Sequence, residues 1–250
     1  MGLFDLFSKE NRSERSIKRY AAKAIHKHIQ SPDRLRALEE LYHAGQNGNE
    51  DAIYAMLKRF SFVYDKTIED EQEKEWLYDA LKALGEKALP PVKRYLSAAD
   101  SISWPLRVLE KIATPEEIFA TLEKLIEQHE PGYERDPSVK QQLMSFIADF
   151  KDPRGVAMIT PYLADMDETV RFTAIEALFK LRDPASREPL CAHFVSDTED
   201  SLRIRVRIAE GFAELGWDVV GFRGTFEKLL PEGFFLDKQG KVKRKARGDE

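Results

Sequence analysis

Apolar residues recur three and four positions apart along almost the whole chain, and strict alternation of apolar and polar residues is nearly absent. This spacing places apolar side chains on one face of an α-helix and excludes a protein built mainly of sheets. We therefore predict an all-α fold made of short amphipathic helices. The predicted helices cover 13–29, 33–44, 49–62, 69–85, 88–98, 102–113, 115–129, 137–150, 153–164, 168–182, 185–195 and 200–216.

Residues that start helices support these boundaries. Thr114-Pro115-Glu116-Glu117 supplies an N-cap hydroxyl, a proline at the first helical position and a glutamate placed to close a capping box. The predicted helices are joined by short links, which favour antiparallel neighbours. The chain is thus expected to form helical hairpins, each with too little apolar surface to fold without a neighbour.

The second helices of these hairpins align with one another. Sliding 168–182 forward by 34 positions or back by 31 places apolar or small residues on its apolar stripe each time. The stripe contains Val170, Ala174, Ala177, Leu178 and Leu181, and its forward match contains Ile204, Ile208, Gly211, Phe212 and Leu215. Repetition at this interval is the signature of a solenoid.

A column of charged residues accompanies the stripe. A base follows the first apolar position and an acid precedes it; the bases are Lys74, Lys140, Arg171 and Arg205, and the acids include Asp136 and Asp167. The resulting pattern at 167–181 resembles the HEAT repeat, in the short bacterial form also found in phycobilisome lyases. The resemblance implies a right-handed α-solenoid superhelix of about five to six hairpins, with the second helices lining a concave face. It also implies that these bases and acids form a structural ladder, with ligand contact as the alternative for the bases.

Four regions are predicted along the chain. They are an apolar N-terminus with a basic helix (1–30), the repeat solenoid (31–216), a C-terminal cap (217–236) and a basic tail or hairpin end (237–250). Phe234-Phe235-Leu236 and Val242 flank a polar turn, which predicts a small β-hairpin in which Gly240 adopts a positive φ.

Composition restricts the class of protein further. The single cysteine, Cys191, excludes an intramolecular disulfide framework. No apolar run is long enough to span a membrane, and the start of the chain lacks the features of a signal peptide, so we expect a cytoplasmic protein. The net charge is −5, and the middle of the chain is acidic while both ends are basic. The acidic middle gives no strong signal for nucleic-acid binding and favours a basic protein partner for the groove.

No catalytic motif and no metal-ligand spacing appears in the sequence, and no cofactor is predicted. The leading interpretation is a non-catalytic HEAT-repeat scaffold or adaptor that binds a protein partner through its concave face or its apolar N-terminus. The alternatives are a lyase-like or chromophore-handling enzyme and a nucleic-acid-binding HEAT-like protein.

Two groups of residues are candidates for partner binding. Exposed positions of the second helices form the first group, which contains Gln142, Thr173, Glu176, Arg207 and Glu210. The apolar N-terminus forms the second group, which contains Leu3, Phe4, Leu6 and Phe7. Three destinations are open for the second group: the first helix, a partner, or an anionic membrane surface that the following basic residues would also contact.

Overall fold

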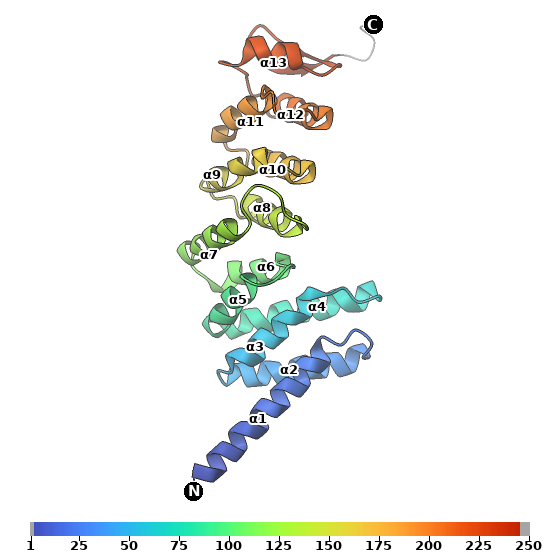
Figure 1. Cartoon of the computed structure of the whole chain (residues 1–250), viewed down its shortest axis with the longest axis vertical. Coiled ribbons are helices and arrows are strands. Elements are labelled where there is room, and N and C mark those ends of the chain that lie inside the picture. The colour runs from blue at the N-terminus through green and yellow to red at the C-terminus, as the bar shows by residue number, and fades with distance from the viewer. Residues whose placement is uncertain (1–2, 246–250) are drawn as a thin grey trace. The chain divides into compact units, whose positions relative to one another are not determined.

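The computed structural model describes the backbone of residues 3–245 and the side chains from residue 14 onward. Each helix that the periodicity predicts is present, and the all-α prediction is confirmed (Figure 1). The α-helices are α1 (Leu3–Ala24), α2 (Ser31–Gln46), α3 (Glu50–Leu57), α4 (Thr67–Leu84), α5 (Leu89–Leu96), α6 (Ser103–Ile112), α7 (Pro115–Gln128), α8 (Ser138–Phe150), α9 (Gly155–Ile159), α10 (Glu168–Leu181), α11 (Arg187–Phe194), α12 (Leu202–Leu215) and α13 (Arg223–Leu229). Short 3-10 helices η1 (Lys58–Ser61), η2 (Gly85–Ala88), η3 (Thr160–Ala164) and η4 (Pro184–Ser186) continue or precede them, and the strands are β1 (Phe234–Leu236) and β2 (Val242–Arg244).

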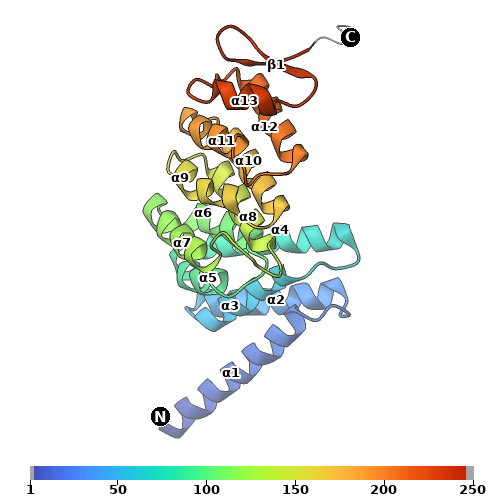
Figure 2. The same ribbon diagram turned by 45° about the horizontal axis from the view of Figure 1, so that its top comes forward.

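The chain divides into two compact units, residues 1–128 and 129–250. In the first unit, α1, α3 and α5 form one layer, and α2, α4 and α6 form the other. In the second unit, α8, α10 and α12 lie side by side, and α9, η3 and α11 form the layer behind them (Figures 1 and 2). Within each unit the hairpins therefore stack as in an α-solenoid. The hand of the superhelix and the region boundaries at 30, 216 and 236 stay predictions.

The aligned apolar stripe forms the core between the layers. Val170, Ala174 and Leu178 of α10 have no exposed surface, and the same holds for Ile204, Ile208 and Phe212 of α12. The last residues of the two stripes, Leu181 and Leu215, are half-buried. Full burial of a large aliphatic side chain is worth about 1.5–3 kcal/mol. One helix face per repeat therefore supplies most of the free energy that holds consecutive hairpins together.

The capping box predicted at the start of α7 is present. The Thr114 N–H donates to the Glu117 carboxylate at 3.0 Å, and the Glu117 N–H donates to Thr114 Oγ1 at 3.3 Å. Each residue thus satisfies a backbone donor that the first turn of the helix leaves free.

A C-terminal cap covers the last hairpin, as predicted. Phe226 of α13 is fully buried and stacks on Phe194 with ring centroids 3.7 Å apart. Beyond it, β1 and β2 pair antiparallel with Leu236 opposite Val242, and Gly240 in the turn has a φ of 77°. Since L-residues rarely adopt this φ, glycine is the residue suited to the turn.

One close approach fixes how α10 packs on α12. A Cβ atom built on Gly211 of α12 would lie 2.2 Å from the ring of Phe179 of α10. The aromatic ring therefore occupies the space where any larger residue would place its side chain. The matched residue of α10 is Ala177, so the repeat has a small residue at this position in both helices, and in α12 it is the smallest one, glycine.

The substitution Gly211→Ala is expected to lower the free energy of unfolding by about 1–3 kcal/mol, because the added methyl group displaces the Phe179 ring. Gly224→Ala in α13 is the matched control, since a Cβ there meets no atom within 4 Å. Urea unfolding followed by circular dichroism measures both. Equal stability of the Gly211→Ala variant and the unsubstituted chain would contradict the packing described here.

Among residues 3–245, no helix combines the length and the apolar character that crossing a bilayer requires.

Candidate functional site

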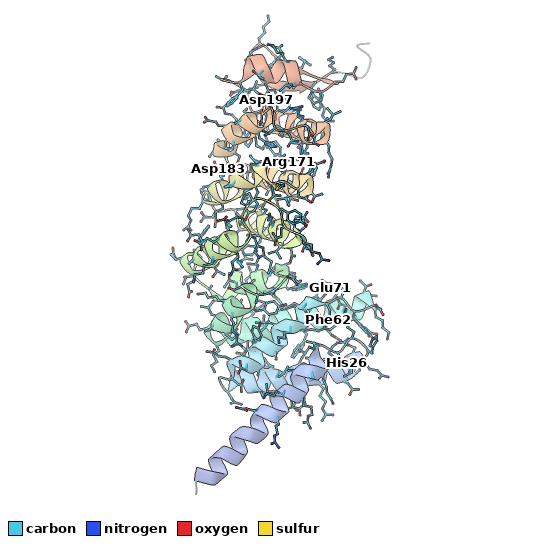
Figure 3. The ribbon with its side chains drawn as sticks, in the orientation of Figure 1. His26, Phe62, Glu71, Arg171, Asp183 and Asp197 are labelled. Carbon is cyan, nitrogen blue, oxygen red and sulfur yellow. The ribbon has the colours of Figure 1, made fainter. Side chains whose placement is uncertain are left out.

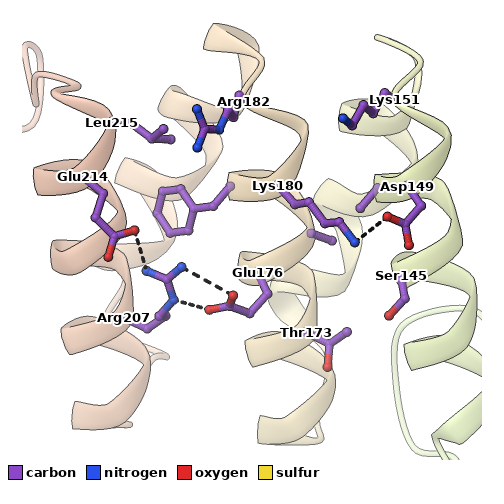
Figure 4. Close-up of a pocket in the computed structure, with 13 residues that line it drawn as sticks. Ser145, Asp149, Lys151, Thr173, Glu176, Lys180, Arg182, Arg207, Glu214 and Leu215 are labelled. Atoms are coloured by element: carbon purple, nitrogen blue, oxygen red, sulfur yellow. Dashed lines mark hydrogen bonds and ion pairs between the residues drawn. The ribbon is translucent and has the colours of Figure 1, made fainter.

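A groove of about 910 Å³ runs over α8, α10 and α12 in the second unit (Figure 4). Its floor is apolar and contains the buried residues Ala177 and Phe179, while its rim is charged. The lining residues are Ser145, Ala148, Asp149, Lys151, Thr173, Glu176, Ala177, Phe179, Lys180, Arg182, Arg207, Glu214 and Leu215. We call this surface the second-helix groove.

The five second-helix positions named from the sequence do not all reach the groove. Thr173, Glu176 and Arg207 line it together. Gln142 donates to the Ser138 carbonyl within α8, at 3.2 Å, and is not in the lining. Glu210 also lies outside the lining and pairs with Arg244 of β2 at 2.9 Å. The structure thus brings three of the five candidates onto one surface, and their role in binding stays a prediction.

The groove does not have the acidic character expected from the middle of the chain. Its lining carries four basic residues, Lys151, Lys180, Arg182 and Arg207, against three acidic residues, Asp149, Glu176 and Glu214. The whole-segment charge was a poor guide, because most acidic residues of the repeats lie outside the lining. The prediction of an acidic groove, and with it the argument for a basic partner, is therefore corrected.

Most of these charges pair across neighbouring helices. Lys180 of α10 lies 2.5 Å from Asp149 of α8, and Arg207 of α12 donates to Glu176 of α10. Arg207 also lies 3.8 Å from Glu214. The first two pairs each connect one second helix with the next, and the third lies within α12, so the rim of the groove is a network of ion pairs.

Sequence reasoning missed two cations of the rim, Lys151 and Arg182. They are the C-cap residues of α8 and α10, and both have left-handed backbone conformations, with φ of 55° and 54°. Gly216 takes the same place after α12, with a φ of 66°. The offsets of 34 and 31 that align the repeats place these three residues on one another, which is the signal that could have found them.

The bases of the charge column form a ladder with buried acids in the second unit, which we call the buried ladder. Lys140, only 1% exposed, donates to Asp165 at 2.8 Å, and the Asp165 carbonyl accepts from Arg171 at 3.0 Å. Arg171, labelled in Figure 3, in turn lies 2.8 Å from Glu199, whose carbonyl accepts from Arg205. Lys140 and Arg171 therefore each reach the loop that precedes the next second helix, whereas Arg205 bonds the loop that precedes its own helix.

The acids that complete this ladder are Asp165 and Glu199, not the predicted Asp136 and Asp167. Asp167 is the N-cap of α10 and accepts from the backbone N–H of Thr169 at 2.7 Å. Asp136 accepts from the Ser138 N–H in the same way. An acid just ahead of a helix faces the free N–H groups of that helix, which explains why these two carboxylates cap rather than pair with a base.

Lys74, the column base of the first unit, belongs to a separate buried cluster. Lys74 contacts Asp70 at 2.6 Å, Asp70 contacts Arg59 at 2.6 Å, and Arg59 contacts Glu73 at 2.8 Å. Glu73 also pairs with Arg34 at 2.7 Å. This cluster ties α2, η1 and α4 together. Its role is structural, because every member is buried among the others.

For the apolar N-terminal group the structure describes the backbone alone. The backbone at Leu3, Phe4, Leu6 and Phe7 belongs to α1, which therefore starts earlier than the predicted residue 13. The side chains of these four residues lie outside the described residues, so their three predicted destinations stay predictions.

The described side chains contain no group of three or more His, Cys, Asp or Glu residues arranged to hold a metal ion. Burial raises the pKa of the Cys191 thiol to about 12, so this cysteine is a protonated core residue at neutral pH.

The substitution Asp165→Asn is expected to destabilise the chain by about 3 kcal/mol, because it removes the nearer carboxylate from the buried Lys140 ammonium and leaves Glu134, 3.7 Å away, as its acidic partner. Adding Lys140→Met should recover much of this loss, since the double variant buries no charge at this position. Chemical unfolding of the two variants provides the measurement. If the double variant is as unstable as Asp165→Asn alone, the ion pair is not the source of the effect.

Stability is expected to fall as the pH drops below about 4.5. Burial alone would raise the pKa of Glu199, but hydrogen bonds from Arg171 and the Ser201 N–H outweigh burial and hold this pKa below its ordinary value of 4.5. The folded state therefore binds fewer protons than the unfolded state, so acid favours unfolding. Unfolding free energies measured from pH 7 to pH 3 test this, and the decline should be shallower in Glu199→Gln. A profile that is the same in both proteins would rule out Glu199 as a contributor.

Comparison with known proteins identifies the repeat. The family described as HEAT repeats matches residues 122–209, which contain most of the second-helix groove and all of the buried ladder. A solved structure of human deoxyhypusine hydroxylase in complex with glycerol is similar over 84% of this chain and 88% of that chain, with 15% sequence identity and a TM-score of 0.32. No curated protein sequence matches the chain.

These findings correct the predicted function. The solved structure named above is that of an enzyme, and the prediction of a non-catalytic scaffold is not supported. At this TM-score the likeness supports no activity for the present chain either. The HEAT repeat predicted from the sequence is confirmed for residues 122–209.

Proposed function

We propose that the chain binds an extended segment of a protein partner in the second-helix groove. One observation carries the proposal: the groove of about 910 Å³ crosses three consecutive second helices and presents charged side chains from each of them. HEAT repeats often serve as protein-interaction modules, which supports the same conclusion. The proposal concerns binding alone and does not depend on the unsupported scaffold interpretation.

The spacing of the helices suits an extended chain. Packed helices lie about 8–10 Å apart. An extended polypeptide advances about 3.3 Å per residue, so about three of its residues pass each helix. A segment crossing α8, α10 and α12 would therefore meet a similar set of side chains at regular intervals. Small-molecule pockets are lined mainly by apolar side chains, in contrast to the charged rim of this groove.

The charge of the groove favours a protein over a nucleic acid. Asp149, Glu176 and Glu214 stand in the rim among the basic residues. Nucleic acids carry closely spaced phosphates and bind to surfaces where cations are not interrupted by carboxylates. A protein segment can instead place each of its own side chains to match the alternating charges.

A photo-reactive amino acid at Ser145 tests this proposal. Ser145 is exposed, belongs to α8 and lines the groove, whereas Ala192 is exposed on α11 in the opposite layer and serves as the matched position. In cells that express the chain naturally, we expect a specific protein adduct from position 145 and none from position 192. The adduct should disappear when Thr173→Trp fills the groove. Adducts from both positions, or from neither, would contradict binding in this groove.

A further inference from the structure

Two cations in the groove have no partner within the described part of the chain. Of the seven charged residues in the lining, five take part in the ion pairs given above. Lys151 and Arg182 are the remaining two, and neither makes an ion pair with any residue whose side chain is described. Both are exposed, and Figure 4 shows them on adjacent second helices at the same end of the groove.

The backbone at these two residues is unfavourable for a long side chain. Both adopt the left-handed conformation, in which glycine is the most stable residue, and the equivalent position after α12 is Gly216. A residue other than glycine is disfavoured in this conformation. A cation near a helix C-terminus regains part of this cost through the helix dipole. The two effects oppose each other, so folding gives little reason for two bases at this end of the groove.

We propose that Lys151 and Arg182 bind two carboxylates of an acidic segment of the partner protein. This inference rests on the proposed function and names the chemistry of the ligand. An acidic segment is favoured by complementary charge, since the two unpaired charged residues of the groove are both positive. Free cations at the rim of an interface select the partner through charge and speed its association.

The repeat geometry also defines the spacing of the two carboxylates. Lys151 and Arg182 occupy equivalent positions on neighbouring helices, which lie about 8–10 Å apart. A polyproline II segment rises about 3.1 Å per residue with three residues per turn, so residues three apart face the same side about 9 Å from each other. The segment expected to fit best has acidic residues at positions i and i+3 in a proline-rich context.

Fluorescence anisotropy with labelled synthetic peptides tests the inference. The probe peptide repeats Glu-Pro-Pro, and its controls carry Gln or Lys in place of Glu. The full chain should bind the Glu peptide more tightly than either control. Lys151→Gly and Arg182→Gly should each weaken binding about threefold to tenfold, as expected for exposed or partly desolvated ion pairs. Lys238→Gln, which removes one positive charge in the C-terminal hairpin, is the matched control and should have no effect.

The glycine variants separate binding from folding. Because glycine suits the left-handed conformation, both variants should melt at or above the temperature of the unsubstituted chain. A loss of thermal stability in both would show that the bases serve the helix C-termini and would overturn the inference. Equal binding of the Glu and Gln peptides, or preference for the Lys peptide or for single-stranded DNA, would overturn it as well.

The two proposals can fail separately. If the Ser145 adduct persists unchanged in Lys151→Gly/Arg182→Gly, a protein binds in the groove without using these cations, and only the present inference is wrong. If the adduct is absent in the unsubstituted chain, the proposed function itself fails.

Discussion

No hairpin of this chain can cover its own apolar face, and every other feature follows from that constraint. Most of the stripe of α10 is buried because α8 and α12 pack beside it. The last hairpin has no successor, and α13 takes that place by stacking Phe226 on Phe194. What remains outside the core is the other side of the second helices, where the groove lies. A surface that stacking leaves uncovered on each repeat is therefore available for binding along its whole length.

Periodicity was sufficient to predict α1 to α12, because burial of one face dictates both the spacing of apolar residues and the order of the hairpins, whereas α13 was predicted only as part of a cap and not as a helix. The capping box at Thr114 and the turn at Gly240 were equally readable, since both depend on residues close in sequence. The acidic partners of the ladder bases could not be predicted from the sequence. Lys140 meets Asp165, 25 positions away in the next hairpin, and only the packed structure decides which of several nearby acids it reaches. Contacts between repeats are the part of the site that one sequence hides.

The groove was predicted in part, because some of its residues follow from helical spacing and others do not. Thr173, Glu176 and Arg207 lie on it because helical spacing places them next to the buried stripe, whose residue Ala177 lies in the floor. Its charge was misjudged, since the net charge of a long segment says nothing about which side chains share one surface. Lys151 and Arg182 escaped notice because their importance comes from a backbone conformation that the residue types themselves do not suggest.

The buried ladder runs from each repeat to the next one along the chain, which bears on the gain or loss of whole repeats. Arg171 pairs with Glu199 ahead of the next second helix and also donates to the carbonyl of Asp165 ahead of its own helix. Each repeat therefore supplies a basic donor to the following repeat and an acidic acceptor to the preceding one. The series ends at Arg205, which is satisfied by backbone carbonyls and requires no further acid. A whole repeat of this kind could therefore be duplicated or deleted without leaving a buried charge unpaired. The chain is therefore modular in its electrostatics as well as in its helices.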